Sequence, residues 1–239
     1  LLRIAETQQD MLIGFDLSMA LPFFDQGGYF PEWDESPRDA KALWRHIDRI
    51  ARDDHHLNVT SFLEHPQAHR HFRHGRGRIG DLFTGGTGRL RQVEHYQRET
   101  GQANSASCFN LVGAAQVGKS SLTGMRLLHR LDGAIPVWPF DPVPDHGPAI
   151  VEIYTTVAAL AAGQPKGRSK VRDRAGLKQA LSRLNTPVPA RLTRYDDHST
   201  DALITAAWMK REAGNPALWN PSALTDEIAQ KEGWTFGVV

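Results

Sequence analysis

The stretch MLIGFD at residues 11–16 is an apolar run that stops at an aspartate. A second run, IVEIYT at residues 150–155, is apolar apart from one glutamate. Runs of this length and composition predict buried β-strands. Apolar residues recur at helical spacing over residues 38–53, and residues 201–213 also read as a helix. Strands that alternate with helices predict an α/β fold, with a mixed or parallel sheet flanked by helices.

Shorter elements complete this pattern. Further helices are expected in three places, over residues 90–99, 121–131 and 177–184. Short strands are expected over residues 58–63, 108–112 and 135–138, and at the aromatic-rich end of the chain.

The composition fits one ordinary globular domain spanning residues 1–239. Hydrophobic residues make up 40% of the chain and charged residues 23%, and the net charge is +1. A charge so near zero does not indicate nucleic acid or a membrane as a partner. The longest largely apolar stretch, residues 149–162, is too short to span a membrane. Cys108 is the only cysteine, which excludes an internal disulfide. We therefore expect a cytoplasmic protein in which Cys108 is a small buried apolar group.

Residues 23–107 read as an insertion that contains the helix at 38–53 and a basic segment. Within residues 65–100, seven arginines and five histidines face only three acidic residues, and glycines interrupt any long element. This composition predicts a flexible surface excursion that could contact the phosphates of a nucleic acid or nucleotide. Four of the histidines, His65, His69, His71 and His74, could be imagined as a metal cluster. Histidines among arginines in a glycine-rich loop are more often solvated.

A phosphate-loop pattern, G-x-x-x-x-G-K-S, runs from Gly113 through Gly118 and Lys119 to Ser120. In a nucleotide-binding protein the backbone N–H groups would cradle phosphates, Lys119 would reach the terminal phosphates and Ser120 would hold Mg²⁺. However, over a hundred residues precede the pattern, and the strong strand that follows carries glutamate instead of aspartate. The other interpretation is a structural turn from a strand into a helix, with Lys119 in solvent.

Four carboxylates mark a possible metal site. Asp16 ends the first strand, Glu152 lies inside the second, and Asp197 and Asp201 share one face at the start of a helix. Hard divalent cations bind several carboxylate oxygens that converge from different elements, as in two-metal phosphoryl hydrolysis. A carboxylate within an apolar strand is costly unless it is paired or liganded, so Glu152 is the most informative of the four.

The order of these segments resembles a family of unknown function in the ribonuclease-H-like superfamily, related in fold to Holliday-junction resolvases. The resemblance covers most of the chain. It rests on the segments IGFDLSMALP at 13–22, LVGAAQVG at 111–118, VWPF at 137–140, VEIY at 151–154, SKVR at 169–172, DHSTDALITAA at 197–207 and EGWTFGV at 232–238.

The resemblance implies that Asp16, Glu152 and Asp201 approach one another at the carboxyl edge of the sheet, with Asp197 close by. It also implies a structural turn at residues 111–118, because relatives lack the lysine that follows. Members of this superfamily begin with a strand that carries the first catalytic aspartate. That strand is not recognisable here, so we expect the first strands of the sheet to lie upstream of Leu1.

The leading hypothesis is a metal-dependent nuclease or other phosphodiester hydrolase, acting on a nucleic acid or nucleotide. Asp16, Glu152, Asp197 and Asp201 would hold Mg²⁺ or Mn²⁺, and Lys170 would neutralise charge that develops on the phosphate. Two alternatives stay open: an ATPase or GTPase that uses the phosphate-loop pattern, and a non-catalytic domain of the same fold.

Overall fold

A three-stranded parallel sheet lies at the centre of the protein, which we describe from a computed structural model. The structure describes residues 1–7, 9–75, 77–84, 86, 88–113, 116–165 and 170–239. Strand β3 (Pro148–Glu152) lies between β1 (Met11–Phe15) and β2 (Val137–Trp138), and pairs in parallel with both. The register sets Phe15 opposite Glu152. The α/β class predicted from the sequence is therefore confirmed.

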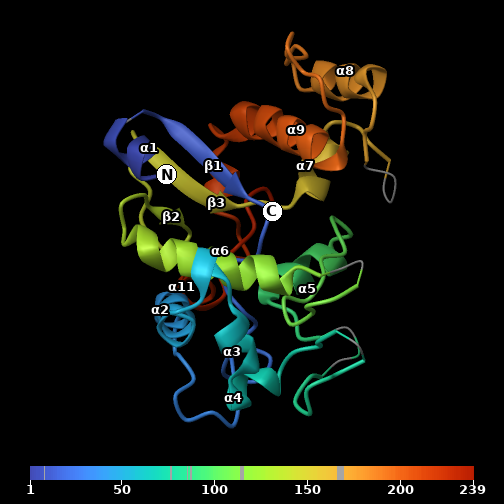
Figure 1. Cartoon of the computed structure of the whole chain (residues 1–239). Helices are drawn as coiled ribbons and strands as arrows, with labels where there is room; N and C mark the ends of the chain where they lie inside the picture. Colours follow the sequence, from blue (N-terminus) through green and yellow to red (C-terminus); the bar gives the residue numbers. More distant parts are fainter. Residues whose placement is uncertain (8, 76, 85, 87, 114–115, 166–169) are drawn as a thin grey trace.

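Helices surround this sheet. They are α1 (Leu2–Thr7), α2 (Ala40–Ile50), η1 (His55–Leu57), α3 (Thr60–Glu64), α4 (Pro66–His69), α5 (Gln92–Glu99), α6 (Gly118–Leu131), α7 (Thr155–Ala161), α8 (Arg174–Arg183), α9 (Asp197–Glu212), α10 (Pro216–Trp219) and α11 (Asp226–Lys231). Figure 1 shows the sheet between α7 and α9 on one side and α2 and α6 on the other.

Each face of β3 is buried in a different hydrophobic core. Side chains alternate along a strand, so Ile150 joins the core that includes α2 and α6, while Val151 joins the core that includes α7 and α9. Both residues are fully buried. A strand covered on both faces needs a continuous apolar run, which explains why the sequence here lacks polar alternation.

The two long flanking helices begin at capped positions. Asp39 precedes α2, and its side chain accepts a hydrogen bond from the Ala42 backbone N–H at 2.8 Å. Asp196 precedes α9 and accepts from the Ser199 backbone N–H at 2.9 Å. Such caps satisfy backbone donors that the first turn leaves free, and they fix where each helix starts.

Three of the predicted strands are wrong. At the aromatic-rich end of the chain the structure has only an isolated bridge, between Thr235 and Glu152. Residues 58–63 contain most of the helix α3 instead. Residues 108–112 form only an isolated bridge, from Asn110 to Arg73, outside the sheet. Their apolar side chains, including Phe109, are nevertheless buried in the core beside α6. Burial alone produced the strand-like pattern, since a buried loop and a buried strand both need apolar residues.

Part of the basic segment is buried, unlike the surface excursion that its composition predicts. Phe72 is fully buried, His71 is 2% exposed, and the arginines Arg89 and Arg91 are 6% and 1% exposed. Arg89 donates to both oxygens of Asp25 and to three backbone carbonyl oxygens. Arg89 therefore ties the loop at residues 22–29 to the segment that precedes α5. Residues 76, 85 and 87 of this segment lie outside the described residues.

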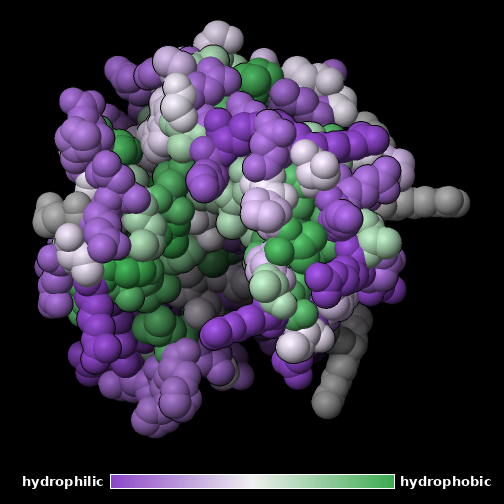
Figure 2. All heavy atoms as spheres, turned by 90° about the horizontal axis from the view of Figure 1, so that it is seen from above, coloured by the Kyte–Doolittle hydropathy of each residue, from purple (hydrophilic) through white to green (hydrophobic). Residues whose placement is uncertain are grey.

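The surface is largely hydrophilic. Figure 2 shows the face seen from above Figure 1, where hydrophobic side chains border a hollow in this surface. Within the part of the chain that the structure describes, there is no helix with the length and apolar character needed to cross a membrane.

Candidate functional site

The carboxyl end of β1 and the first turns of α9 bring two of the predicted acids to one pocket. The pocket has a volume of about 630 Å³, and Asp16 and Asp201 both line it. They are neighbours electrostatically, since the charge of Asp201 acts on Asp16. The sequence separates them by most of the chain, so only the fold brings them together. The resemblance implies that Asp16, Glu152 and Asp201 approach one another; of these three, Asp16 and Asp201 line the pocket and Glu152 is not among its lining residues.

The environment of Asp16 disfavours its ionised form. Partial loss of hydration against the pocket walls raises the pKa of Asp16 above its ordinary value. A hydrogen bond from the Thr155 backbone N–H opposes this shift, and the nearby charge of Asp201 adds to it. A carboxylate disfavoured in this way gains from any cation that binds beside it.

The side chain of Lys170 provides a positive charge beside the two acids. Its ammonium group pairs with the Asp201 carboxylate. Loss of hydration works to lower the pKa of Lys170, but the hydrogen bond and the charge of Asp201 outweigh it and raise the pKa. The predicted proximity of Lys170 to the acidic site is therefore present. Residues 166–169, which precede Lys170 in the predicted basic loop, lie outside the described residues.

Asp197 does not share the pocket with Asp201. Its two carboxylate oxygens accept from Arg172 at 2.7 and 2.9 Å, in a paired arrangement near the surface. Arg172 holds the pKa of Asp197 below its ordinary value. Asp197 is one turn before Asp201 on α9, but the described residues that line the pocket include His198 and Asp201 instead.

Glu152 is committed to a buried ion pair. Its carboxylate accepts from the two terminal nitrogens of Arg91 at 2.6 and 2.8 Å. The Met19 backbone N–H and the Thr235 hydroxyl donate to the same carboxylate, at 2.8 and 2.7 Å. Glu152 is 4% exposed. Its oxygens thus face protein donors, which makes it a structural residue in this arrangement and not a free metal ligand.

Arg91 is the residue that reasoning from the sequence missed. Besides Glu152 it contacts the Glu94 carboxylate at 2.7 Å and donates to the Glu232 backbone carbonyl at 3.0 Å. Glu232 in turn accepts from the backbone N–H groups of residues 23, 24 and 92. The sequence contains one sign of this ion pair: a glutamate within an apolar strand, Glu152, requires a buried partner of opposite charge. The local pattern could not say which arginine it is.

The other wall of the pocket is apolar. Gly14 packs so closely against Ile153 and Met209 that an added Cβ would lie within 3.0 Å of both side chains. Thr205 of α9 also lines the pocket, is 2% exposed, and its hydroxyl has no hydrogen-bond partner among the described residues. The site therefore combines the acids Asp16 and Asp201 with apolar side chains and one free hydroxyl, and Asp10 and Lys210 also line it.

No group of three or more histidine, cysteine or acidic side chains converges as a metal cage within the described residues. The histidines of the basic segment do not form one either. His69 stacks on His74, with ring centroids 4.0 Å apart, and His74 pairs with the His69 backbone carbonyl. Any metal ion at the candidate site would have to be held by the Asp16 and Asp201 carboxylates, completed by water or by a ligand.

The phosphate-loop pattern has a helix after it but no strand before it among the described residues. Gly118 and Lys119 open α6, Ser120 donates back to the Val117 carbonyl at 2.9 Å, and Gly113 adopts a left-handed backbone with φ of 93°. An added Cβ on Gly118 would lie 2.4 Å from the Cys108 carbonyl oxygen. Residues 114–115, inside the loop, lie outside the described residues.

Comparison with known proteins returned no match, whether to a family model, to a curated protein or to a solved structure.

Proposed function

We propose that this protein is a divalent-metal-dependent phosphodiester hydrolase whose site is the pocket of Asp16 and Asp201. The observation that carries this proposal is the meeting of these two acids, from a strand end and a helix, with Lys170 as their present counter-ion. The substrate would be a nucleic acid or nucleotide phosphodiester. The related proposal of a ribonuclease-H-like fold is supported by the parallel order of β1 and β3 and by the packing of α9 over them.

The two acids fit one Mg²⁺ or Mn²⁺ ion. Mg²⁺ in proteins is commonly held by one or two carboxylates, with water and substrate phosphate as its other ligands. When bound, the ion would supply positive charge next to the phosphoryl group. With Glu152 paired to Arg91, the residues available favour one ion over the two-metal cluster that the sequence suggests.

The protein's own residues would then complete the chemistry. Asp16 and Asp201 would hold the ion, and the Lys170 ammonium group, which pairs with Asp201 in the structure, would neutralise charge on the scissile phosphate. The apolar side chains that line the pocket, including Met209, would accommodate a base or sugar.

Metal binding by the purified protein tests this proposal directly. Titration calorimetry with Mn²⁺ should show one site per chain, and Asp16→Asn or Asp201→Asn should weaken binding at least tenfold. Asp132→Asn is the matched control, because Asp132 has a left-handed backbone that asparagine tolerates well, and it lies away from the pocket. Hydrolysis of a nitrophenyl phosphodiester with Mn²⁺ should fall in the same two variants.

Equal Mn²⁺ binding by the wild type and both pocket variants would overturn the proposal. Metal binding without hydrolysis of any phosphodiester would favour the non-catalytic alternative. The pairing of Glu152 with Arg91 already counts in that direction, since it removes one of the acids expected to act. The ATPase or GTPase alternative lacks a strand before its loop among the described residues.

A further inference from the structure

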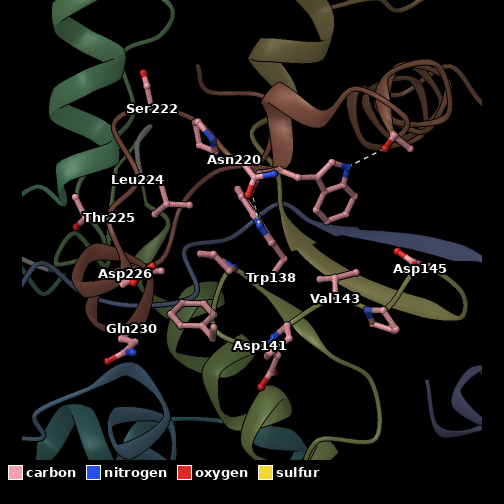
Figure 3. Close-up of a pocket in the computed structure, with 18 residues that line it drawn as sticks. Trp138, Asp141, Val143, Asp145, Asn220, Ser222, Leu224, Thr225, Asp226 and Gln230 are labelled. Atoms are coloured by element: carbon pink, nitrogen blue, oxygen red, sulfur yellow. Dashed lines mark hydrogen bonds between the residues drawn. The ribbon is translucent and has the colours of Figure 1, made fainter.

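A second pocket lies away from the acidic pair, between the loop that follows β2 and the segment that contains α10 and α11. It has a volume of about 970 Å³, within the range of small-molecule sites. Figure 3 shows Trp138 in the middle of this pocket, with Leu224 and Asp226 on one side and Val143 and Asp145 on the other.

The floor of this pocket is aromatic and its hydrogen-bond donors are already used. Trp138 donates its indole N–H to the Trp219 carbonyl at 3.2 Å, and Trp219 donates to the Ala213 carbonyl at 2.8 Å. The two indoles meet edge to face, with centroids 5.9 Å apart, and both pack against the fully buried Phe236. What the floor can still offer a ligand is aromatic surface, which suits methylene groups and cations.

The charge of the pocket is entirely negative among the described residues that line it. Asp141, Asp145 and Asp226 are present, with no lysine, arginine or histidine. Asp141 is neutralised by Lys41. Asp145 and Asp226 have no ion-pair partner within the part of the chain that the structure describes, while the neighbouring bases His146 and Lys231 pair with acids outside the pocket.

We propose that this pocket binds a linear aliphatic polyamine. Asp145 and Asp226 stand on opposite sides of the aromatic floor (Figure 3), so each can accept hydrogen bonds from one terminal ammonium group. The methylene chain between the ammonium groups then lies across Trp138 and Trp219. A metal ion is a poor match, because hard cations need oxygens that converge on one point. This inference is independent of the proposed hydrolase activity.

Titration calorimetry of the full chain with spermidine tests the proposal, with tryptophan fluorescence as a second signal from Trp138 and Trp219. Spermidine should bind at one site, and Asp145→Asn/Asp226→Asn should weaken binding at least tenfold. Asp34→Asn/Glu99→Gln removes the same charge from two exposed acids outside the pocket and should bind as the wild type does. A second pocket variant, Ser222→Arg, adds a cation at an exposed position on the rim and should also block binding.

Two comparisons distinguish a specific polyamine site from nonspecific attraction of cations to negative charge. Octanediol, which has a similar chain but no charge, should not compete with spermidine, and butylamine should bind more weakly because it has one ammonium group. Equal loss of binding in the Asp34→Asn/Glu99→Gln control would overturn the proposal. So would an identical signal with Mg²⁺ at the same ionic strength, since any cation would then serve.

Discussion

Glu152 shows how one buried charge is made compatible with an apolar strand. The strand core must exclude water, yet the carboxylate needs several donors to compensate for its lost hydration. Arg91, the Met19 backbone N–H and the Thr235 hydroxyl supply them. Because each donor comes from a different segment, the charge ties together parts of the chain that are far apart in the sequence.

Removal of this charge should destabilise the fold. We expect Glu152→Gln to lower the free energy of unfolding by about 3 kcal/mol, because the buried Arg91 guanidinium loses one of its two carboxylate partners and keeps only Glu94. Urea unfolding followed by circular dichroism measures this. Glu227→Gln is the control. It breaks the exposed pair with Lys231, and we expect a change below about 0.5 kcal/mol.

A double variant checks that the effect comes from the pair. Glu152→Gln with Arg91→Gln should cost less than the sum of the two single changes, since the contact between Glu152 and Arg91 is then counted only once, although Glu94 loses its partner in both variants that change Arg91. Strict additivity would contradict the ion-pair interpretation. If Glu152→Gln instead abolished hydrolysis at unchanged stability, Glu152 would be part of the catalytic site after all.

The charge of Asp16 should lower the stability of the folded protein, whereas the charge of Glu152 should raise it. Its pKa is raised in the folded protein, so the folded state holds the proton more tightly than the unfolded state does. Stability of the wild type should therefore fall as the pH rises from about 4 through the folded pKa. With chelator present, Asp16→Asn should have the higher melting temperature at pH 7, and the difference should vanish below pH 4.

Asp10 provides a control with the reverse sign. The Gly147 backbone N–H and His146 hold the pKa of Asp10 below its ordinary value. Asp10→Asn should therefore lower the melting temperature at pH 7, with the difference fading as the pH falls below about 4. If Asp16→Asn also lowered it, the wall of the pocket would not disfavour the Asp16 charge.

At the scale of elements, the spacing of apolar residues predicts the helices and strands in which buried residues recur at a regular interval. The central strands β1 and β3 and the helices α2 and α9 lie where their apolar patterns placed them. The segment at 108–112 was mistaken for a strand because it is buried without being regular. For the site, Asp16 and Asp201 could be found at element ends, and Lys170 in the predicted basic loop. The partner of Glu152 could not, because 61 residues separate it from Arg91 and no local pattern encodes such a pair.

The turn into α6 gives an element-scale test of the phosphate-loop interpretation. Gly118→Ala should destabilise the protein by about 1–3 kcal/mol, because the new methyl group would collide with the Cys108 carbonyl oxygen. Lys119 is exposed, so Lys119→Ala should change stability by less than about 0.5 kcal/mol. Thermal melts with and without millimolar Mg-ATP or Mg-GTP complete the test. Stabilisation by nucleotide that is lost in Lys119→Ala would show a working phosphate loop.

At the scale of the whole molecule, buried histidines make the fold sensitive to acid. Burial lowers the pKa of His46 and of His71 to about 4, and it also lowers the pKa of His74. His46 is 7% exposed, and His71 packs between Phe30 and Phe109. Both are folded in the neutral form, so their contribution to stability is complete above pH 6.5 and is lost as the pH falls from there toward 4.

Equilibrium unfolding between pH 4 and pH 7 measures this loss. We expect up to roughly 3 kcal/mol for each histidine, from the shift between its unfolded and folded pKa. His71→Phe should flatten the pH dependence by about half. The exposed His95→Gln should leave its slope unchanged. An unaltered slope in His71→Phe would show that other groups cause the acid sensitivity.

The contacts of Glu152 also determine when this chain can finish folding during synthesis. Strand β3 pairs with β1, whose partner residues lie more than a hundred positions earlier, and the Phe236 backbone N–H donates to the Glu152 carbonyl at 2.8 Å. A nascent chain still short of residue 236 would hold the Glu152–Arg91 charge pair beside an unfilled gap in the core. Long-range pairing of this kind folds slowly and leaves apolar surface open in the meantime. The central sheet therefore gains its last backbone partner only when the segment around Phe236 has been made.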